Sequence, residues 1–224
     1  VWIVAHQDPT ALIVIVGTGL LAMVLRITVS WVYTLVAGVV IGIILSLLMP
    51  VLLPEVVAET IKVSKQVLTE MVAELGAEAG QQLDEWLHNL FSGILGSVHL
   101  YAMVGSLIIA RWWQAALYNP GGFKEEFHRL ILPRLMALPM MLVMVFGGGV
   151  HPLILGWIPV MTVPFVIAAL ALVHGVVGIR KLAGQWLFAF YMLIILLGPY
   201  FFMLLIVMAF LDSLLDFRRR IQTD

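Results

Sequence analysis

The apolar stretches of this 224-residue chain hold few ionisable side chains, and two histidines stand out among them. His99 lies near the middle of one apolar stretch, close to Tyr101, and His174 lies toward the end of another. An ionisable side chain deep in a membrane is a candidate for function, because a neutral imidazole can hydrogen-bond a ligand or a neighbouring helix. These groups predict a dry-walled ligand cavity lined by His99, Tyr101, Thr162, Pro164 and His174.

Other interpretations of the two histidines remain open. Both could form interhelical hydrogen bonds or lie at the membrane interface without touching a ligand. Two histidines on different helices could also ligate a haem, but a transmembrane dihaem site would need more such residues. We therefore expect no cofactor.

No enzyme signature occurs in the sequence. HExxH, GxSxG and P-loop patterns are missing, and the lack of cysteine excludes disulfides, thiolate metal sites and thiol catalysis. Gly147–Gly149 follows an apolar stretch without a strand signal, so it does not predict a nucleotide-binding loop. We expect no catalytic residue and no metal site, and any ATP hydrolysis would come from another chain.

The elements that position these residues must lie in lipid. The chain is 62% hydrophobic and 11% charged, with a mean hydropathy of +1.09, whereas soluble domains are about 45–50% apolar and about 25% charged. So few charges could not cover so much apolar surface in water. This composition predicts a multi-span integral membrane protein in contact with the lipid bilayer. The net charge of −1 argues against nucleic acid as a partner.

Six apolar stretches predict six transmembrane helices in a single membrane domain, residues 1–224. They lack the two-residue alternation of barrel strands, so we expect an all-α, polytopic helical bundle. Pro159, Pro164 and Pro199 are expected to kink the last two helices. Because the first ten residues read like the end of an apolar segment and a loop, we expect further N-terminal residues. The predicted spans are residues 11–25, 31–53, 91–110, 132–149, 153–179 and 186–211.

Residues 54–90 differ from the rest, because seven acidic and two basic residues alternate there with apolar residues at helical spacing. This pattern predicts an amphipathic extramembrane helix between the second and third spans, broken near Gly76 or Gly80. Its negative charge disfavours binding to anionic lipid. The segment is either a solvated cap over the bundle or a docking surface for another protein.

Residues 111–131 are predicted to form a connector at the membrane surface. The residues 119–122, Asn-Pro-Gly-Gly, are a strong turn signal. The FKEEFHRL stretch that follows predicts a short amphipathic approach to the next span, with Glu125 and Arg129 as an i,i+4 pair. Aromatic residues suited to the interface between lipid and water precede the turn, and they are Trp112, Trp113 and Tyr118.

Six spans place the loops alternately on two sides, and positive charge indicates which side is cytoplasmic. Seven basic residues fall on one side and five on the other, so the positive-inside rule places the first set in the cytoplasm. Arg218–Arg220 conflict with this assignment, because they fall on the outer side. The first set is Arg26, Arg111, Lys124, Arg129, Arg134, Arg180 and Lys181.

Several motifs together resemble the YybS-like family of bacterial inner-membrane proteins. They are RWWQ…LYNPGGF…EEF within residues 111–127, DPT at 8–10, VPF…ALALVHG at 163–175, KLAG.W at 181–186 and LDSLLDFR at 211–218. The resemblance covers most of the chain but not residues 54–90. It implies a relation to the substrate-binding S subunits of energy-coupling-factor (ECF) transporters. Such subunits are six-helix bundles that hold a small molecule near the outer face and meet a transmembrane coupling subunit.

We therefore predict a small-molecule-binding, transport-type membrane subunit of the bacterial inner membrane, with no enzymatic activity. The alternative is an accessory subunit that packs against a larger membrane protein complex and binds no solute. The GxxxG motif in the second span allows close approach of helices, and the connector could be buried on a partner. The predicted partner-binding residues are Gly38, Gly42, Arg111, Trp112, Trp113, Asn119, Pro120, Gly121 and Gly122.

Overall fold

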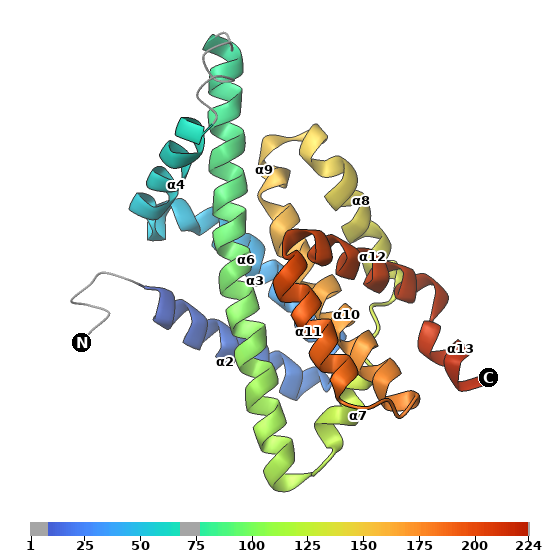
Figure 1. Ribbon diagram of the computed structural model, residues 1–224. Coiled ribbons are helices and arrows are strands. Elements are labelled where there is room, and N and C mark those ends of the chain that lie inside the picture. Colours follow the sequence, from blue (N-terminus) through green and yellow to red (C-terminus); the bar gives the residue numbers. More distant parts are fainter. Residues whose placement is uncertain (1–8, 68–76, 224) are drawn as a thin grey trace.

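The computed structural model describes residues 9–67 and 77–223. Helices account for nearly all of these residues and no strand occurs among them, which confirms the predicted all-α fold (Figure 1). The helices are α2 (Thr10–Thr28), α3 (Trp31–Leu52), α4 (Pro54–Val67), α6 (Ala77–Tyr118), α7 (Gly122–His128), α8 (Arg134–Val150), α9 (Pro152–Leu155), α10 (Trp157–Ile179), α11 (Gln185–Leu197), α12 (Pro199–Leu215) and α13 (Phe217–Thr223).

Four helical stretches are long and apolar enough to cross a membrane, and they support an integral membrane protein. The other apolar helices are shorter, with 17 residues in α8, 13 in α11 and 17 in α12. At 1.5 Å per residue they extend about 20–26 Å, less than the roughly 30 Å of bilayer hydrocarbon. The six predicted spans are therefore confirmed only in part. The four long stretches are Thr10–Thr28, Trp31–Leu52, Gly80–Tyr118 and Pro152–Ile179.

The predicted last span, residues 186–211, is not one helix. Gly198 has φ 48° and ψ −123°, a conformation that ends α11, and Pro199 then occupies the first position of α12. Glycine tolerates this backbone conformation and proline favours the first turn of a helix. Pro199 thus begins a helix and does not kink one. Figure 1 shows α11 and α12 meeting at an angle at this point.

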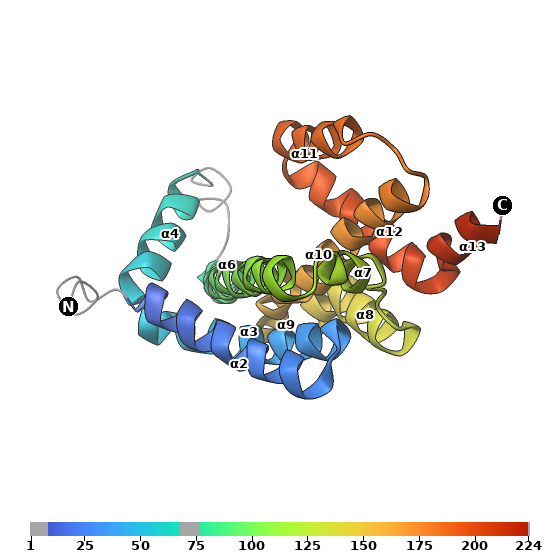
Figure 2. The same cartoon turned by 90° about the horizontal axis from the view of Figure 1, so that it is seen from below.

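The core centres on α10, which packs against α3, α6, α7, α8 and α12. Seen along α6, the helices α2 and α3 lie on one side, and α11 and α12 lie on the other (Figure 2). The α10 side chains Val160, Val163 and Phe165 are fully buried. A helix that is apolar on all sides suits this central position.

Small residues let α3, α6 and α10 approach closely. A Cβ atom added at Gly96 of α6 would lie 3.0 Å from the carbonyl oxygen of Gly42 and the backbone nitrogen of Ser46 on α3. One added at Gly38 would lie 3.1 Å from Leu100. Gly38 and Gly42, predicted to bind a partner, are therefore buried in contacts within the chain. The motif indicates helix packing, as such motifs commonly do.

The polar segment 54–90 contributes to two helices. Most of its first half forms α4, and its end forms the first turns of α6, which continue without a break past Gly80. The predicted break at Gly80 is therefore wrong, and Gly76 lies outside the described residues. Lys65 on α4 and Asp84 on α6 form an ion pair, and Val57 is buried. We call α4 and the start of α6 the acidic end.

The opposite end of the molecule gathers the last turn of α6, α7, the end of α10 and α13 (Figure 1). Arg218 donates hydrogen bonds to the carbonyl oxygens of His128 and Leu130, so the C-terminal arginines lie beside the connector. Their predicted location on the outer side is wrong, because the break at Gly198 changes the path of the chain. Ten of the twelve Lys and Arg residues then belong to one end, which we call the basic end, and the conflict with the positive-inside rule disappears.

Candidate binding pocket at the basic end

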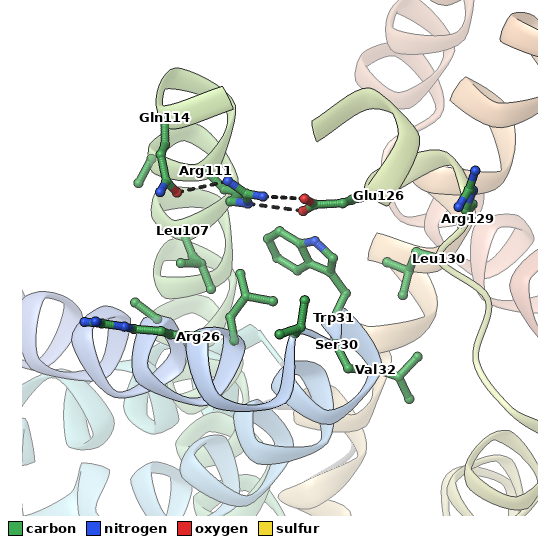
Figure 3. Close-up of a pocket in the computed structure, with 14 residues that line it drawn as sticks. Arg26, Ser30, Trp31, Val32, Leu107, Arg111, Gln114, Glu126, Arg129 and Leu130 are labelled. Carbon is green, nitrogen blue, oxygen red and sulfur yellow. Dashed lines mark hydrogen bonds and ion pairs between the residues drawn. The ribbon is translucent and has the colours of Figure 1, made fainter. Parts of the chain in front are cut away.

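A pocket of about 800 Å³ opens between α2, α3, α6 and α7 at the basic end (Figure 3). This volume lies within the range of small-molecule sites, about 300–1,000 Å³. One part of the wall is apolar and another carries charged and hydrogen-bonding groups. The lining residues are Ala22, Leu25, Arg26, Val29, Ser30, Trp31, Val32, Leu107, Ala110, Arg111, Gln114, Glu126, Arg129 and Leu130.

The corner between α2 and α3 forms one wall of the pocket. Val29 caps α2 in the left-handed conformation, with φ 50°, and its N–H donates to the carbonyl oxygen of Leu25 at 2.8 Å. Ser30 is extended and precedes α3. This short corner brings the end of α2, with Arg26, beside the start of α3, with Trp31.

The reversal between α6 and α7 forms the opposite wall. The N–H of Gly122 donates to the carbonyl oxygen of Asn119 at 3.0 Å, and Gly121 has φ 91°, which favours glycine. The predicted turn at residues 119–122 is confirmed. The predicted connector is only partly correct, because α6 continues to Tyr118 and includes Arg111, Trp112 and Trp113.

Arg111 on α6 and Glu126 on α7 tie the two helices of this wall together through a paired interaction. The Arg111 Nε–H donates to Glu126 Oε2 at 3.1 Å, and Nη2 donates to Oε1. Arg111 Nη1 also donates to Gln114 Oε1 at 3.0 Å. The two side chains are half-buried, and a fork of this kind gives directional as well as electrostatic stabilisation.

The expected Glu125–Arg129 pair does not occur among the described ion pairs. Helix α7 ends at His128, so Arg129 lies beyond its last residue and the i,i+4 geometry is incomplete. The neighbouring carboxylate, Glu126, binds Arg111 instead. Arg129 is exposed at the edge of the pocket, and Arg26 is exposed at another edge (Figure 3).

Trp31 supplies a buried hydrogen-bond donor to the wall. Its side chain is 5% exposed, and its indole N–H has no acceptor among the described residues. Figure 3 shows the indole beside the Arg111–Glu126 pair. The ring also meets Phe123 edge-on, with centroids 6.3 Å apart. Because buried indole N–H groups usually find a partner, this N–H is a candidate donor to a bound molecule.

A buried ion pair fixes the segment that follows α7. Arg218 Nη2 lies 2.7 Å from Asp212 Oδ2 and donates to the carbonyl oxygen of Leu130 at 2.6 Å. Asp212 Oδ1 accepts the N–H of Phe217 at 3.0 Å. Asp212 and Arg218 are 2% and 5% exposed. This clamp holds Leu130, which lines the pocket, against the C-terminal helices.

The five residues predicted to bind a ligand do not line this pocket. The Tyr101 hydroxyl lies 3.1 Å from Thr162 Oγ1, which connects α6 with α10, and Pro164 is buried farther along α10. His174 Nε2 lies 2.8 Å from the Tyr191 hydroxyl. Tyr101 and Thr162 are therefore brought together, and His174 has a different partner.

His99 occupies a third environment. It is 5% exposed, its Nδ1 lies 2.7 Å from the carbonyl oxygen of Leu95, and its Nε2 has no partner among the described residues. His174 thus makes an interhelical hydrogen bond between α10 and α11, as the alternative interpretation expected, whereas the hydrogen bond of His99 lies within its own helix α6. A ligand role for these five residues stays a prediction.

Several pocket residues were not singled out from the sequence. The polar ones are Arg26, Ser30, Trp31, Gln114, Glu126 and Arg129, of which Arg26 and Arg129 were considered only for topology or local pairing. A usable signal was present, since a serine before an apolar run marks a helix start. The sequence did not show that this helix start faces the α6–α7 turn, because that contact is made in the tertiary fold.

Taken together, the four long apolar helices define an integral membrane protein of the helical-bundle class, with a polar-rimmed pocket at its basic end. Comparison with protein-family models, curated proteins and solved structures found no match. The fold and the pocket therefore carry the functional argument.

Proposed function

We propose that this chain is a solute-binding subunit of a transport system in the bacterial inner membrane. The observation that carries the proposal is the pocket of about 800 Å³, which combines an apolar wall with charged and hydrogen-bonding residues. Such a combination is typical of sites for small organic molecules. Transport energy would come from a partner, consistent with the lack of a nucleotide-binding loop in the sequence.

The resemblance to ECF S subunits supports a binding role but implies a ligand near the outer face. The pocket lies instead at the basic end, which the positive-inside rule assigns to the cytoplasm. We therefore place the ligand site at the basic end, where the pocket lies. It implies that the ligand enters or leaves this site from the cytoplasmic side.

The test is native mass spectrometry of the protein purified gently in a neutral detergent. We expect a small molecule to remain bound to the wild type. Ala110 lines the pocket on α6 and is exposed, so Ala110→Trp should fill the space and remove the bound molecule. Ala116 is exposed on the same helix but does not line the pocket, so Ala116→Trp should retain it. Loss from both variants, or retention by both, would contradict the proposed site.

A second candidate is the accessory subunit, and one observation favours it. Trp112, Trp113 and Tyr118 are 54%, 63% and 83% exposed at the end of α6. This 42-residue helix extends about 63 Å, twice the hydrocarbon thickness of a bilayer. Stoichiometric partner chains in the same spectra, lost on Trp112→Ala/Trp113→Ala and accompanied by no bound solute, would favour this function.

A further inference from the structure

We infer that the pocket binds an acidic amphiphile, a molecule that joins a carboxylate or phosphate group to an apolar body. The inference rests on the proposed function of the pocket. Three arginines and one glutamate line it, with Arg26 and Arg129 at opposite edges (Figure 3). The carboxylate of Glu126 is already paired with Arg111, whereas Arg26 and Arg129 have no carboxylate partner among the described residues. The pocket therefore has an excess charge of +2.

The pocket wall also offers hydrogen-bond donors that lack acceptors. The start of the 22-residue helix α3 lies in the wall, which includes Ser30, Trp31 and Val32. The Ser30 side chain makes no capping hydrogen bond to this helix. The first N–H groups of a helix have no partner within the helix and favour an anion. The buried indole N–H of Trp31 is a further donor without an acceptor among residues 9–67 and 77–223. An anionic oxygen would accept hydrogen bonds from these donors.

The remaining wall determines the rest of the ligand. An apolar surface lies beside the charged groups, and it is formed by Ala22, Leu25, Val29, Leu107 and Leu130. A small inorganic anion would leave this surface uncovered, while an apolar body would remove it from water. Charge and apolar wall together select an amphiphile over a purely polar anion.

Two sources share this chemistry. One is an acidic lipid from the adjacent leaflet, and the other is a soluble organic acid or organic phosphate. Both present an anionic group to the basic end and an apolar body to the wall. The experiment must separate them while testing the acidic amphiphile itself.

The probe is dodecyl phosphate, titrated into protein in neutral detergent and followed by native mass spectrometry, with dodecanol as the uncharged comparison. We expect dodecyl phosphate to bind at least about tenfold more tightly than dodecanol, as expected for charge-assisted hydrogen bonds. Arg26→Gln/Arg129→Gln should weaken its binding about tenfold or more. The matched control is Arg180→Gln/Lys181→Gln, which removes two charges from the same end outside the pocket and should leave binding unchanged.

A second arm identifies the source, using nanodiscs that contain phosphatidylglycerol or only phosphatidylcholine. Phosphatidylglycerol that is retained by wild type, but not by Ala110→Trp, supports the inference with a lipid ligand. A co-purified soluble acid that dodecyl phosphate displaces supports it with a metabolite. A neutral or cationic molecule in the pocket overturns the inference and leaves the proposed function standing. If Ala110→Trp changes the binding of no molecule, both fail.

Discussion

The two ends of the molecule hold their charges in different ways. At the basic end, Asp212 and Arg218 form a buried pair, and Arg218 also satisfies two carbonyl oxygens of the connector. At the acidic end, Lys62 Nζ lies 3.3 Å from Glu59 Oε2, and the two side chains are 63% and 64% exposed. Exposed pairs contribute about 0–1 kcal/mol, whereas removing one partner of a buried pair leaves an uncompensated charge.

This difference shows which charges shape the fold. The acidic end exposes Glu55, Glu59, Asp84 and Glu85 to solvent, so its ion pairs add little to stability. The basic end uses one buried pair to hold the connector, and the connector carries Glu126, Arg129 and Leu130 into the pocket. The structure of the pocket therefore depends on the C-terminal clamp.

Breaking the clamp should have the largest effect. Arg218→Ala leaves Asp212 buried without a counter-ion and leaves the carbonyl oxygens of His128 and Leu130 without donors. We expect a loss of about 3–5 kcal/mol in the free energy of unfolding. Equilibrium unfolding in mixed detergent micelles would measure it. Lys62→Ala at the acidic end is the comparison, and it should cost less than about 1 kcal/mol. Equal losses in the two variants would contradict the larger contribution to stability that we assign to the buried pair.

An intermediate loss of stability is expected from a substitution in the middle of α6, the helix that connects the two ends. Gly96 packs against the backbone of α3, so Gly96→Ala must push the helices apart. Overpacking of this kind costs about 1–3 kcal/mol. Gly105 lies on the same helix with nothing within 4 Å of an added Cβ atom, so Gly105→Ala should not destabilise the protein. The same unfolding measurement compares them, and a destabilised Gly105→Ala variant would contradict the packing argument.

Much of the fold could be predicted from the sequence, because composition and local pattern determine it. The long apolar runs predict helices that are surrounded by lipid. The predicted span 31–53 nearly matches α3. The Asn119–Gly122 turn follows from local backbone preference. The close approach of α3 and α6 follows from small residues at helical spacing.

The remaining features depend on contacts that a linear pattern does not contain. The run at 186–211 is apolar throughout, so hydropathy did not reveal that Gly198 ends a helix. Glu126 was missed because its partner lies 15 residues away, across the turn. Arg218 meets Leu130 across 88 residues, and that contact decided on which side the C-terminus lies. The pocket is built from such contacts, which explains why the candidate residues chosen from the spans lie elsewhere.

The smallest expected effect concerns the pH dependence of the basic end. Burial lowers the pKa of His128 below its ordinary value, and the nearby charges of Lys124, His174 and Arg218 lower it further. The ordinary pKa in the unfolded chain is about 6.5. As the pH falls through that value, the unfolded state binds a proton at His128 while the folded state does not. Stability therefore decreases from about pH 6.5 down to the folded pKa, and this loss is complete below it.

Replacing the imidazole should remove this part of the pH dependence. In His128→Asn the backbone carbonyl that accepts the Arg218 hydrogen bond is kept, so the clamp remains. Thermal unfolding midpoints of both proteins, measured between about pH 8 and pH 5, should differ by a constant amount at high pH. Below about pH 6.5 the wild type should lose stability more steeply than the variant. Parallel curves over the whole range would mean that His128 binds its proton equally well in the folded and unfolded chains.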